Sequence, residues 1–230
     1  MASELVEVAF KGNRTGIFTN PVGINIKTGD YVIVGVERGE DAGIVIGLGR
    51  VVTLKEIDVE PPQLLRLATP ADLDKIEKNR DEENKAFEVC KEKISKHDLN
   101  MKLVDVEYQF DRNKLTFYFT SDQRVDFRQL VRDLAAKYRT RIELRQIGVR
   151  DEAKRIGGYG TCGYKLCCNT FMREFETITT QHAKEQLLPM NPSKLSGVCG
   201  RLKCCLAFEK LFYISDMEKY PEIGTVWHNE

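Results

Sequence analysis

Six of the seven cysteines fall into two segments with the same pattern. Residues 160–168 and residues 197–205 both read Gly-x-Cys-Gly-x-x-x-Cys-Cys, without a gap in either. Each cysteine of the second segment follows its counterpart by 37 residues, as Cys199 follows Cys162 (199 − 162). The six cysteines are Cys162, Cys167, Cys168, Cys199, Cys204 and Cys205. This duplication of sulfur donors predicts a site that the two segments build together.

Thiolates are soft ligands that suit zinc ions and iron–sulfur clusters. Neighbouring side chains diverge, so an adjacent cysteine pair should not easily hold one small tetrahedral ion. The pair therefore faces two centres, or one cysteine binds while the other packs. A [4Fe–4S] cluster takes four cysteines and two clusters take eight. Six cysteines supply one cluster with two thiols to spare, or two clusters with two ligands from another chain.

Two other kinds of site remain open. Zinc is the first alternative, because the Cys-x-x-x-x-Cys spacing lies at the upper edge of the usual range. His182 and His228 could complete zinc sites, although neither lies in the repeat. A thiol redox switch is the second, since Lys165 and Lys203 are near enough in sequence to lower the pKa of a thiol. We predict an iron–sulfur centre in preference to both.

Charge and composition give little support to other chemistry. Lys and Arg total 35, as do Asp and Glu, so attraction to nucleic acid or membrane must come from a local patch. One candidate for RNA contact consists of Arg139, Arg141, Arg145, Arg150, Lys154 and Arg155. The alternative for this patch is an edge strand guarded by solvated charges. No nucleotide-binding glycine loop or nucleophile–base motif is evident, so we expect a protein that is not an enzyme.

Hydropathy and cysteine usage predict a cytoplasmic protein. The N-terminal residues contain no signal-peptide pattern, and no segment approaches the roughly 20 apolar residues of a membrane span. The cytoplasm disfavours structural disulfides, and an odd number of cysteines argues further against complete pairing.

The elements that position these residues are predicted to form an α+β protein of three regions. Residues 1–60 contain short runs of β-branched residues separated by glycines, which is typical of a small barrel-like domain. Strands are expected over 5–10, 31–36, 43–46 and 51–54, with a turn-rich stretch after the first. Residues 61–149, after a proline pair, indicate a helix over 71–97, a hairpin around 111–113, a helix over 127–138 and a last strand. This α-β-β-α-β order predicts helices on one face of a sheet, and Cys90 at helical spacing is expected to be a buried apolar thiol. Residues 150–230 form the cysteine-rich region, with helical segments after each cysteine pair.

The cysteine segments also carry a resemblance to a known family. Residues 160–163 with 166–168, and the run Asn-Pro-Ser-Lys-Leu-Ser-Gly-Val-Cys-Gly-Arg-Leu-x-Cys-Cys over 191–205, resemble the bacterial YaaT family, also called RicT. The middle region is similar to a module that this family shares with a eukaryotic polymerase-suppressor protein. The resemblance covers nearly the whole chain.

The resemblance implies a non-enzymatic adaptor that carries an iron–sulfur cluster of the [4Fe–4S] type, with the six repeat cysteines as candidate ligands. It also implies two small helical partners, YlbF-like and YmcA-like proteins, in a complex that assists RNase Y in maturing messenger RNA. Competence, biofilm formation and sporulation are the processes affected in some hosts of the family.

Overall fold

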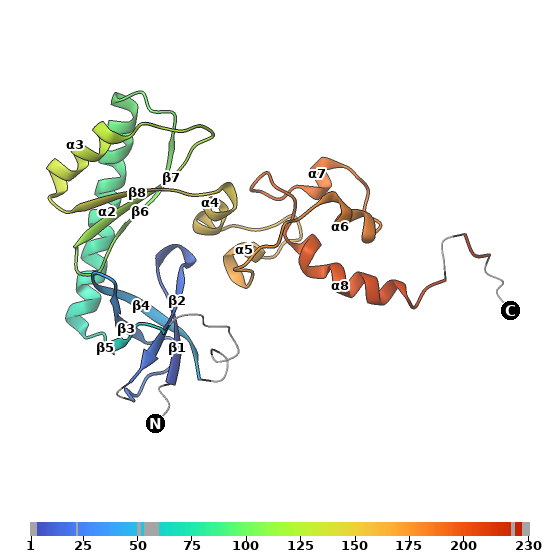
Figure 1. The fold of residues 1–230 in the computed structure, drawn as a ribbon, viewed down its shortest axis with the longest axis horizontal. Helices are drawn as coiled ribbons and strands as arrows, with labels where there is room; N and C mark the ends of the chain where they lie inside the picture. Colours follow the sequence, from blue (N-terminus) through green and yellow to red (C-terminus); the bar gives the residue numbers. More distant parts are fainter. Residues whose placement is uncertain (1–3, 22, 50–51, 53–59, 222–223, 227–230) are drawn as a thin grey trace. The chain divides into compact units, whose positions relative to one another are not determined.

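The computed structural model describes residues 4–21, 23–49, 52, 60–221 and 224–226. The chain divides into two compact units, residues 1–148 and residues 149–230 (Figure 1). The first unit contains both β-sheets, and the second consists of short helices and loops. The predicted mixture of helices and strands is therefore confirmed.

A curled antiparallel sheet forms the first part of the N-terminal unit. Its five strands are β1 (Glu4–Ala9), β2 (Thr15–Asn20), β3 (Tyr31–Val36), β4 (Gly39–Leu48) and β5 (Leu64–Leu67), in the order β2-β1-β4-β3-β5. The two outer strands approach each other where the amide of Thr19 donates to the carbonyl of Pro62 at 2.9 Å. A parallel bridge joins Thr19 to Gln63. The sheet is thus a half-barrel, which agrees with the barrel-like fold predicted for this region.

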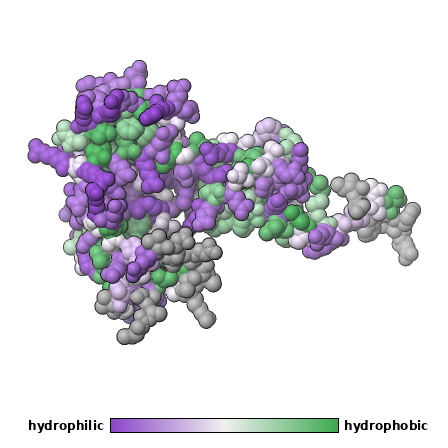
Figure 2. All heavy atoms as spheres, viewed as in Figure 1, coloured by the Kyte–Doolittle hydropathy of each residue, from purple (hydrophilic) through white to green (hydrophobic). Residues whose placement is uncertain are grey.

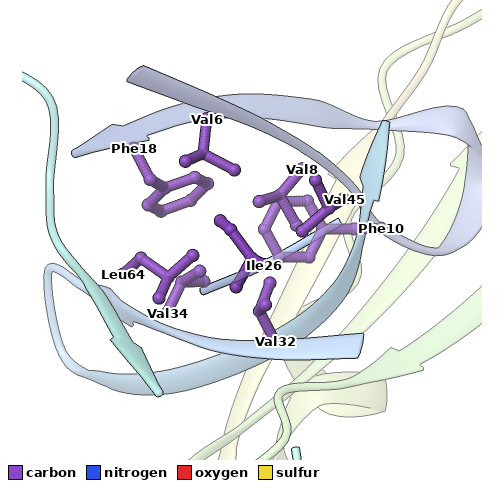
Figure 3. Packing of buried hydrophobic residues seen from close by; sticks show 9 residues of the cluster. All are labelled: Val6, Val8, Phe10, Phe18, Ile26, Val32, Val34, Val45 and Leu64. Carbon is purple, nitrogen blue, oxygen red and sulfur yellow. The ribbon is translucent and has the colours of Figure 1, made fainter. Parts of the chain in front are cut away.

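Alternate side chains of these strands fill the concave side of the sheet. Figure 3 shows Val6, Val8 and Phe18 pointing toward the side chains from β3 and β5. Phe10 and Phe18 meet edge to face with ring centroids 5.9 Å apart. Alternation with period two places apolar residues on one face, as a strand requires.

Two features of this sheet differ from the sequence prediction. The stretch after the first strand was predicted to consist of turns, but it contains strand β2. A single tight turn (η1, Lys11–Asn13), with Gly12 and Asn13 at φ 67° and 57°, reverses the chain so that β2 pairs with β1. Strand β5 follows the proline pair and still pairs with β3, so the sheet extends past the boundary expected at residue 60. The strand predicted over 51–54 lies almost wholly outside the described residues.

The remainder of the N-terminal unit follows the predicted α-β-β-α-β order. Its elements are α2 (Pro70–Lys96), β6 (Lys102–Tyr108), β7 (Lys114–Thr120), α3 (Arg128–Tyr138) and β8 (Arg141–Gln146). Strands β6 and β7 form an antiparallel hairpin, and α3 is the crossover that makes β8 parallel to β7. Cys90 of α2 packs with Leu115, Phe117, Leu130 and Leu134 in the core between helices and sheet.

Half-buried ion pairs link the turn between β1 and β2 to β4, β6 and α2 of the same unit. Arg14 bridges Asp41 at 3.0 Å and Glu107 at 2.6 Å, and Lys11 bridges Glu83 at 2.8 Å. Removing Arg14 would leave the carboxylates of Asp41 and Glu107, which are 13% and 9% exposed, without their cation, and this is destabilising. These contacts explain why residues 1–148 form one compact unit.

The C-terminal unit has little core of its own. It contains α4 (Val149–Ile156), α5 (Cys167–Thr170), α6 (Thr180–Glu185), α7 (Pro192–Leu195) and α8 (Cys205–Met217). The buried apolar cluster here consists of Ala183, Leu195 and Leu206, with Ile178 and Leu202 packed against it. In the part of the chain that is described, none of the helices combines the length and apolar character needed to cross a bilayer.

Candidate metal centre

The two cysteine segments fold into loops with the same hydrogen bonds. In the first loop the amide of Gly160 donates to the carbonyl of Tyr164 at 2.8 Å, and the amide of Gly163 donates to the carbonyl of Gly160 at 3.0 Å. The second loop repeats both bonds at the same two lengths among Gly197, Arg201 and Gly200. The sequence duplication is therefore a structural duplication as well.

A glycine with positive φ follows the first cysteine of each loop. Gly163 has φ 82° and Gly200 has φ 74°. Residues with a side chain rarely adopt this conformation, whereas glycine adopts it freely. The expectation that glycine lets the backbone turn tightly beside each cysteine is confirmed at these two positions.

Each loop leads into a helix through another matched bond. The amide of Leu166 donates to the carbonyl of Gly158 at 3.0 Å, and the amide of Lys203 donates to the carbonyl of Leu195 at 2.9 Å. Helix α5 then begins at Cys167, and α8 begins at Cys205. The helices predicted after each cysteine pair are thus present, although α5 is a single turn.

All six repeat cysteines line one cavity of about 130 Å³. A water molecule occupies about 30 Å³ of liquid, and a cavity of about 150 Å³ holds benzene, so this space is large enough for more than a single ion. Cys162 is exposed, Cys168 is buried and the other four are half-buried. Three cationic residues also line the cavity: Arg150, Lys165 and Lys203.

Thiols from both loops influence one another here. Burial raises the pKa of Cys167 to about 11, and the nearby thiols of Cys204 and Cys205 add to this increase. Burial also raises the pKa of Cys168, with Cys204 and Cys199 adding to it and Arg150 opposing it. A redox-switch cysteine needs a lowered pKa, so the raised pKa of these two thiols does not favour that alternative. A metal bound here must displace their protons.

The geometry differs from that of a closed site for one ion. Among the residues that the structure describes, no three His, Cys, Asp or Glu side chains are grouped to hold a single metal ion. His182 does not line the cavity; its Nδ1 lies 3.1 Å from the hydroxyl of Thr179 at the start of α6. His228 lies outside the described residues. Cys90 is buried in the other unit, where burial raises its pKa to about 12, as expected for an apolar thiol.

Sequence comparisons identify the family. Two family models match the chain: "PSP1 C-terminal conserved region" over residues 62–147 and "PSP1-like protein, third domain" over residues 177–220. Stage 0 sporulation protein YaaT of Bacillus subtilis is 47% identical over 96% of this chain and 80% of its own length. The chain belongs to the YaaT family.

Two fungal proteins share part of this YaaT-family sequence. An uncharacterized protein of Schizosaccharomyces pombe is 34% identical over 59% of the chain, and Protein PSP1 of Saccharomyces cerevisiae is 31% identical over 49% of it. The matches span 22% and 17% of the two fungal proteins. No solved structure matches the chain.

The arginines predicted as an RNA-contact patch take different roles in this family member. Arg141 and Arg145 are exposed on β8, on the face opposite Ile142 and Leu144, and so share one face as predicted. Arg139 ends α3 with φ 51°. Arg150 lines the cysteine cavity instead, while Lys154 and Arg155 lie half-buried on the same helix α4 and both make polar contacts.

No sequence pattern predicted that Arg150 lies beside the cysteines, because Arg150 precedes the first repeat and lies on a separate helix, α4. The rings of Phe171 and Phe208 also pack against each other, with centroids 4.8 Å apart, and the sequence gives a weak indication of this contact. Both residues stand in the apolar stretch that follows a cysteine pair, and they are separated by the same 37 positions (208 − 171).

Proposed function

We propose that this YaaT-family protein is a non-catalytic adaptor that holds an iron–sulfur cluster in the cavity lined by its two cysteine loops. One observation carries the proposal: six cysteines from two matching loops line a single cavity. Both loops must be present for the cavity to form, which is the arrangement expected if both supply ligands.

The composition of the cavity fits an anionic, polynuclear group. A [4Fe–4S] cluster takes four thiolates, and the cavity offers six. Two thiols then remain, or a second cluster completes its ligand set with residues of a partner protein. Arg150, Lys165 and Lys203 offset the negative charge of the thiolates. When bound, the cluster would supply electron transfer or a covalent link between the loops.

The small core of the C-terminal unit gives the cluster a structural role. Its buried apolar cluster consists of Ala183, Leu195 and Leu206. Small units with little core are commonly stabilised by a metal, and binding energy then becomes folding energy. A cluster that joins residues 162–168 to residues 199–205 would tie the two halves of this unit together.

The surface of α8 supports the role of an adaptor. Phe208, Leu211 and Phe212 are 60%, 77% and 66% exposed on this helix. Figure 2 shows hydrophobic residues at the surface of the C-terminal unit among hydrophilic ones. Contiguous exposed apolar surface marks interaction sites. Following the family resemblance, the partners we propose are small helical YlbF-like and YmcA-like proteins and, in the cytoplasm, RNase Y and its messenger RNA substrates.

Metal and sulfide analysis after anaerobic purification tests this proposal. The wild-type chain, produced with its helical partners, should contain iron and acid-labile sulfide in equal amounts and a broad absorption band in visible light. Replacing the six repeat cysteines by serine should remove both, while the matched variant Cys90→Ala should retain both. A colourless wild-type protein with stoichiometric zinc would contradict the proposal.

A zinc-stabilised nucleic-acid-binding module is the second candidate. The observation that favours it is the exposure of Arg141 and Arg145 on the same face of β8. Arginine is well suited to phosphate contacts, which lose affinity as salt is raised. Zinc retention together with salt-dependent RNA binding would support this function.

A further inference from the structure

Arg150 is held in place by two contacts on different parts of the C-terminal unit. Its Nη2 atom donates a hydrogen bond to the carbonyl oxygen of Leu202 at 3.2 Å. Its Cζ atom lies 4.7 Å from the centroid of the Phe175 ring, within the range of a cation–π contact. The side chain is half-buried and lines the cysteine cavity.

Arg150 contacts the second cysteine loop directly and lies on a helix that is joined to the first. Leu202 belongs to the second loop, between Cys199 and Cys204. The helix that carries Arg150, α4, is joined to α5 of the first loop by a hydrogen bond from the side-chain amide of Asn169 to the carbonyl of Lys154 at 2.7 Å. The guanidinium therefore has a fixed position relative to the cysteines of both loops.

We propose that Arg150 supplies a fixed positive charge to the cysteine cavity. This charge slows the loss of a thiolate-bound cofactor and raises the reduction potential of that cofactor. This inference rests on the proposed function, since it concerns the same cavity. Arginine stays charged under all conditions that proteins experience. A half-buried cation interacts with nearby negative charge more strongly than an exposed one, because less water screens it.

The other two cations of the cavity are less suited to this role. Lys165 is exposed, and its long flexible side chain can turn into water. Lys203 lies within the second loop, and its charge likewise stands at the end of a long, flexible side chain. Arg150 alone of the three is fixed by a backbone carbonyl and an aromatic ring.

The test compares three variants of the full chain, purified anaerobically with its partners. Arg150→Gln removes the charge, Arg150→Lys keeps it, and Arg201→Gln removes a matched charge that is exposed on the second loop outside the cavity. Two quantities are measured: the rate at which a chelator removes iron, and the midpoint potential of the cluster in a dye-mediated titration.

We expect Arg150→Gln to release iron about tenfold faster. We expect its midpoint potential to fall by about 59 mV, which is a tenfold change in the equilibrium constant of a one-electron step. The potential falls because the reduced cluster carries one more negative charge and loses the cation that stabilised it. Arg150→Lys should stay close to wild type, and so should Arg201→Gln.

Equal release rates and potentials for Arg150→Gln and wild type would overturn the inference. Failure of both Arg150→Gln and Arg150→Lys to load a cofactor would overturn it too, because the shape of arginine rather than its charge would then be required. If Arg150→Gln alone fails to load, the charge is required and the inference stands. A wild-type chain that holds zinc instead would remove the proposed function, and the release rate of zinc from the same variants would still decide the role of Arg150.

Discussion

Phe171 and Phe208 occupy equivalent positions in the two repeats, and their rings pack with centroids 4.8 Å apart at an angle of 57°. Each lies four residues after the first cysteine of its adjacent pair. The amide of Phe171 donates to the carbonyl of Cys167 at 3.2 Å, and the amide of Phe208 donates to that of Cys204 at 3.3 Å. Contact between the rings therefore brings the two cysteine pairs together.

A double-mutant cycle on these two rings should show energetic coupling. Aromatic pairs contribute about 0.5–1.5 kcal/mol beyond the area they bury. We expect Phe171→Ala and Phe208→Ala each to speed the release of bound metal, and the double variant to be less impaired than the sum of the two. Phe212→Ala is the matched control, because Phe212 is exposed on the same helix and contacts Tyr213 rather than the first repeat. Strict additivity of the two substitutions would contradict the structural link.

The two glycines with positive φ should respond alike to substitution. An added Cβ would meet nothing within 4 Å at Gly163 or at Gly200, so the cost of alanine there is conformational alone. We expect each alanine variant to lower the stability of its loop by about 1 kcal/mol, measured as faster amide hydrogen exchange in residues 158–168 or 195–205. Asparagine should cost less, because it tolerates this conformation. Gly197→Ala is the control, since φ is not positive there and the added Cβ would make ordinary contacts.

The sequence was most informative where hydrophobic periodicity was strong. The i, i+3, i+4 series that contains Leu130 and Leu134 predicted α3, and the structure buries both residues. Alternation around Phe117 predicted the hairpin of β6 and β7. Strand β2 has only Ile17 and Phe18 as large apolar residues, and its pairing with β1 depends on the turn before it, so periodicity did not reveal it.

For the cysteine site, the duplication predicted which residues gather but not what surrounds them. A repeat in sequence implies a repeat in structure, and the cysteines of both loops do line one cavity. The position of Arg150 depends instead on the packing of α4 against α5 and on a bond to the Leu202 carbonyl. Contacts to backbone carbonyls leave no mark on residue spacing, so no pattern could have indicated this residue.

The buried thiol of Cys90 should make stability depend on pH in alkaline solution. Burial raises its pKa from 9.0 to about 12, so the folded state holds this proton more tightly than the unfolded state. The stabilisation is complete below pH 9.0 and is lost as pH rises toward 12. In the variant that lacks the six repeat cysteines, the free energy of unfolding in urea should fall over this pH range. When Cys90→Ala is added, the part of the fall that is due to the Cys90 thiol should disappear. Rapid reaction of Cys90 with a thiol reagent in the native state at neutral pH would contradict its burial.

Asp72 should contribute to stability in the opposite pH range. The guanidinium of Arg66 donates to its carboxylate, as do the amide and hydroxyl of Thr69 at 2.8 Å and 2.7 Å, and these contacts lower the pKa of Asp72 from 3.8. Its contribution is present above pH 3.8 and is lost as pH falls toward the lowered value. Asp72 is the N3 residue of the capping box that Thr69 begins, so we expect Asp72→Asn to reduce the free energy of unfolding by about 1 kcal/mol at pH 7, the size of a capping contact. The difference from wild type should shrink in acid, as followed by urea titrations at several pH values. A difference that is constant down to the acid transition would contradict the role of the charge.

The exposed arginines of β8 give a direct test for RNA contact. Arg141 and Arg145 are exposed on one face of β8, and Glu143, which lies between them in the strand, pairs with Lys114 of β7 at 3.6 Å. If they contact phosphates, Arg141→Gln and Arg145→Gln should each weaken RNA binding for all sequences alike and reduce the slope of log affinity against log salt by about 0.7, the value for one single-strand phosphate contact. Filter binding over a range of salt concentrations measures this, with Arg132→Gln on α3 as the control. Unchanged affinity and slope in the double variant would contradict RNA contact. The two arginines would then be solvated charges that protect β8, an edge strand of its sheet, from pairing with other chains.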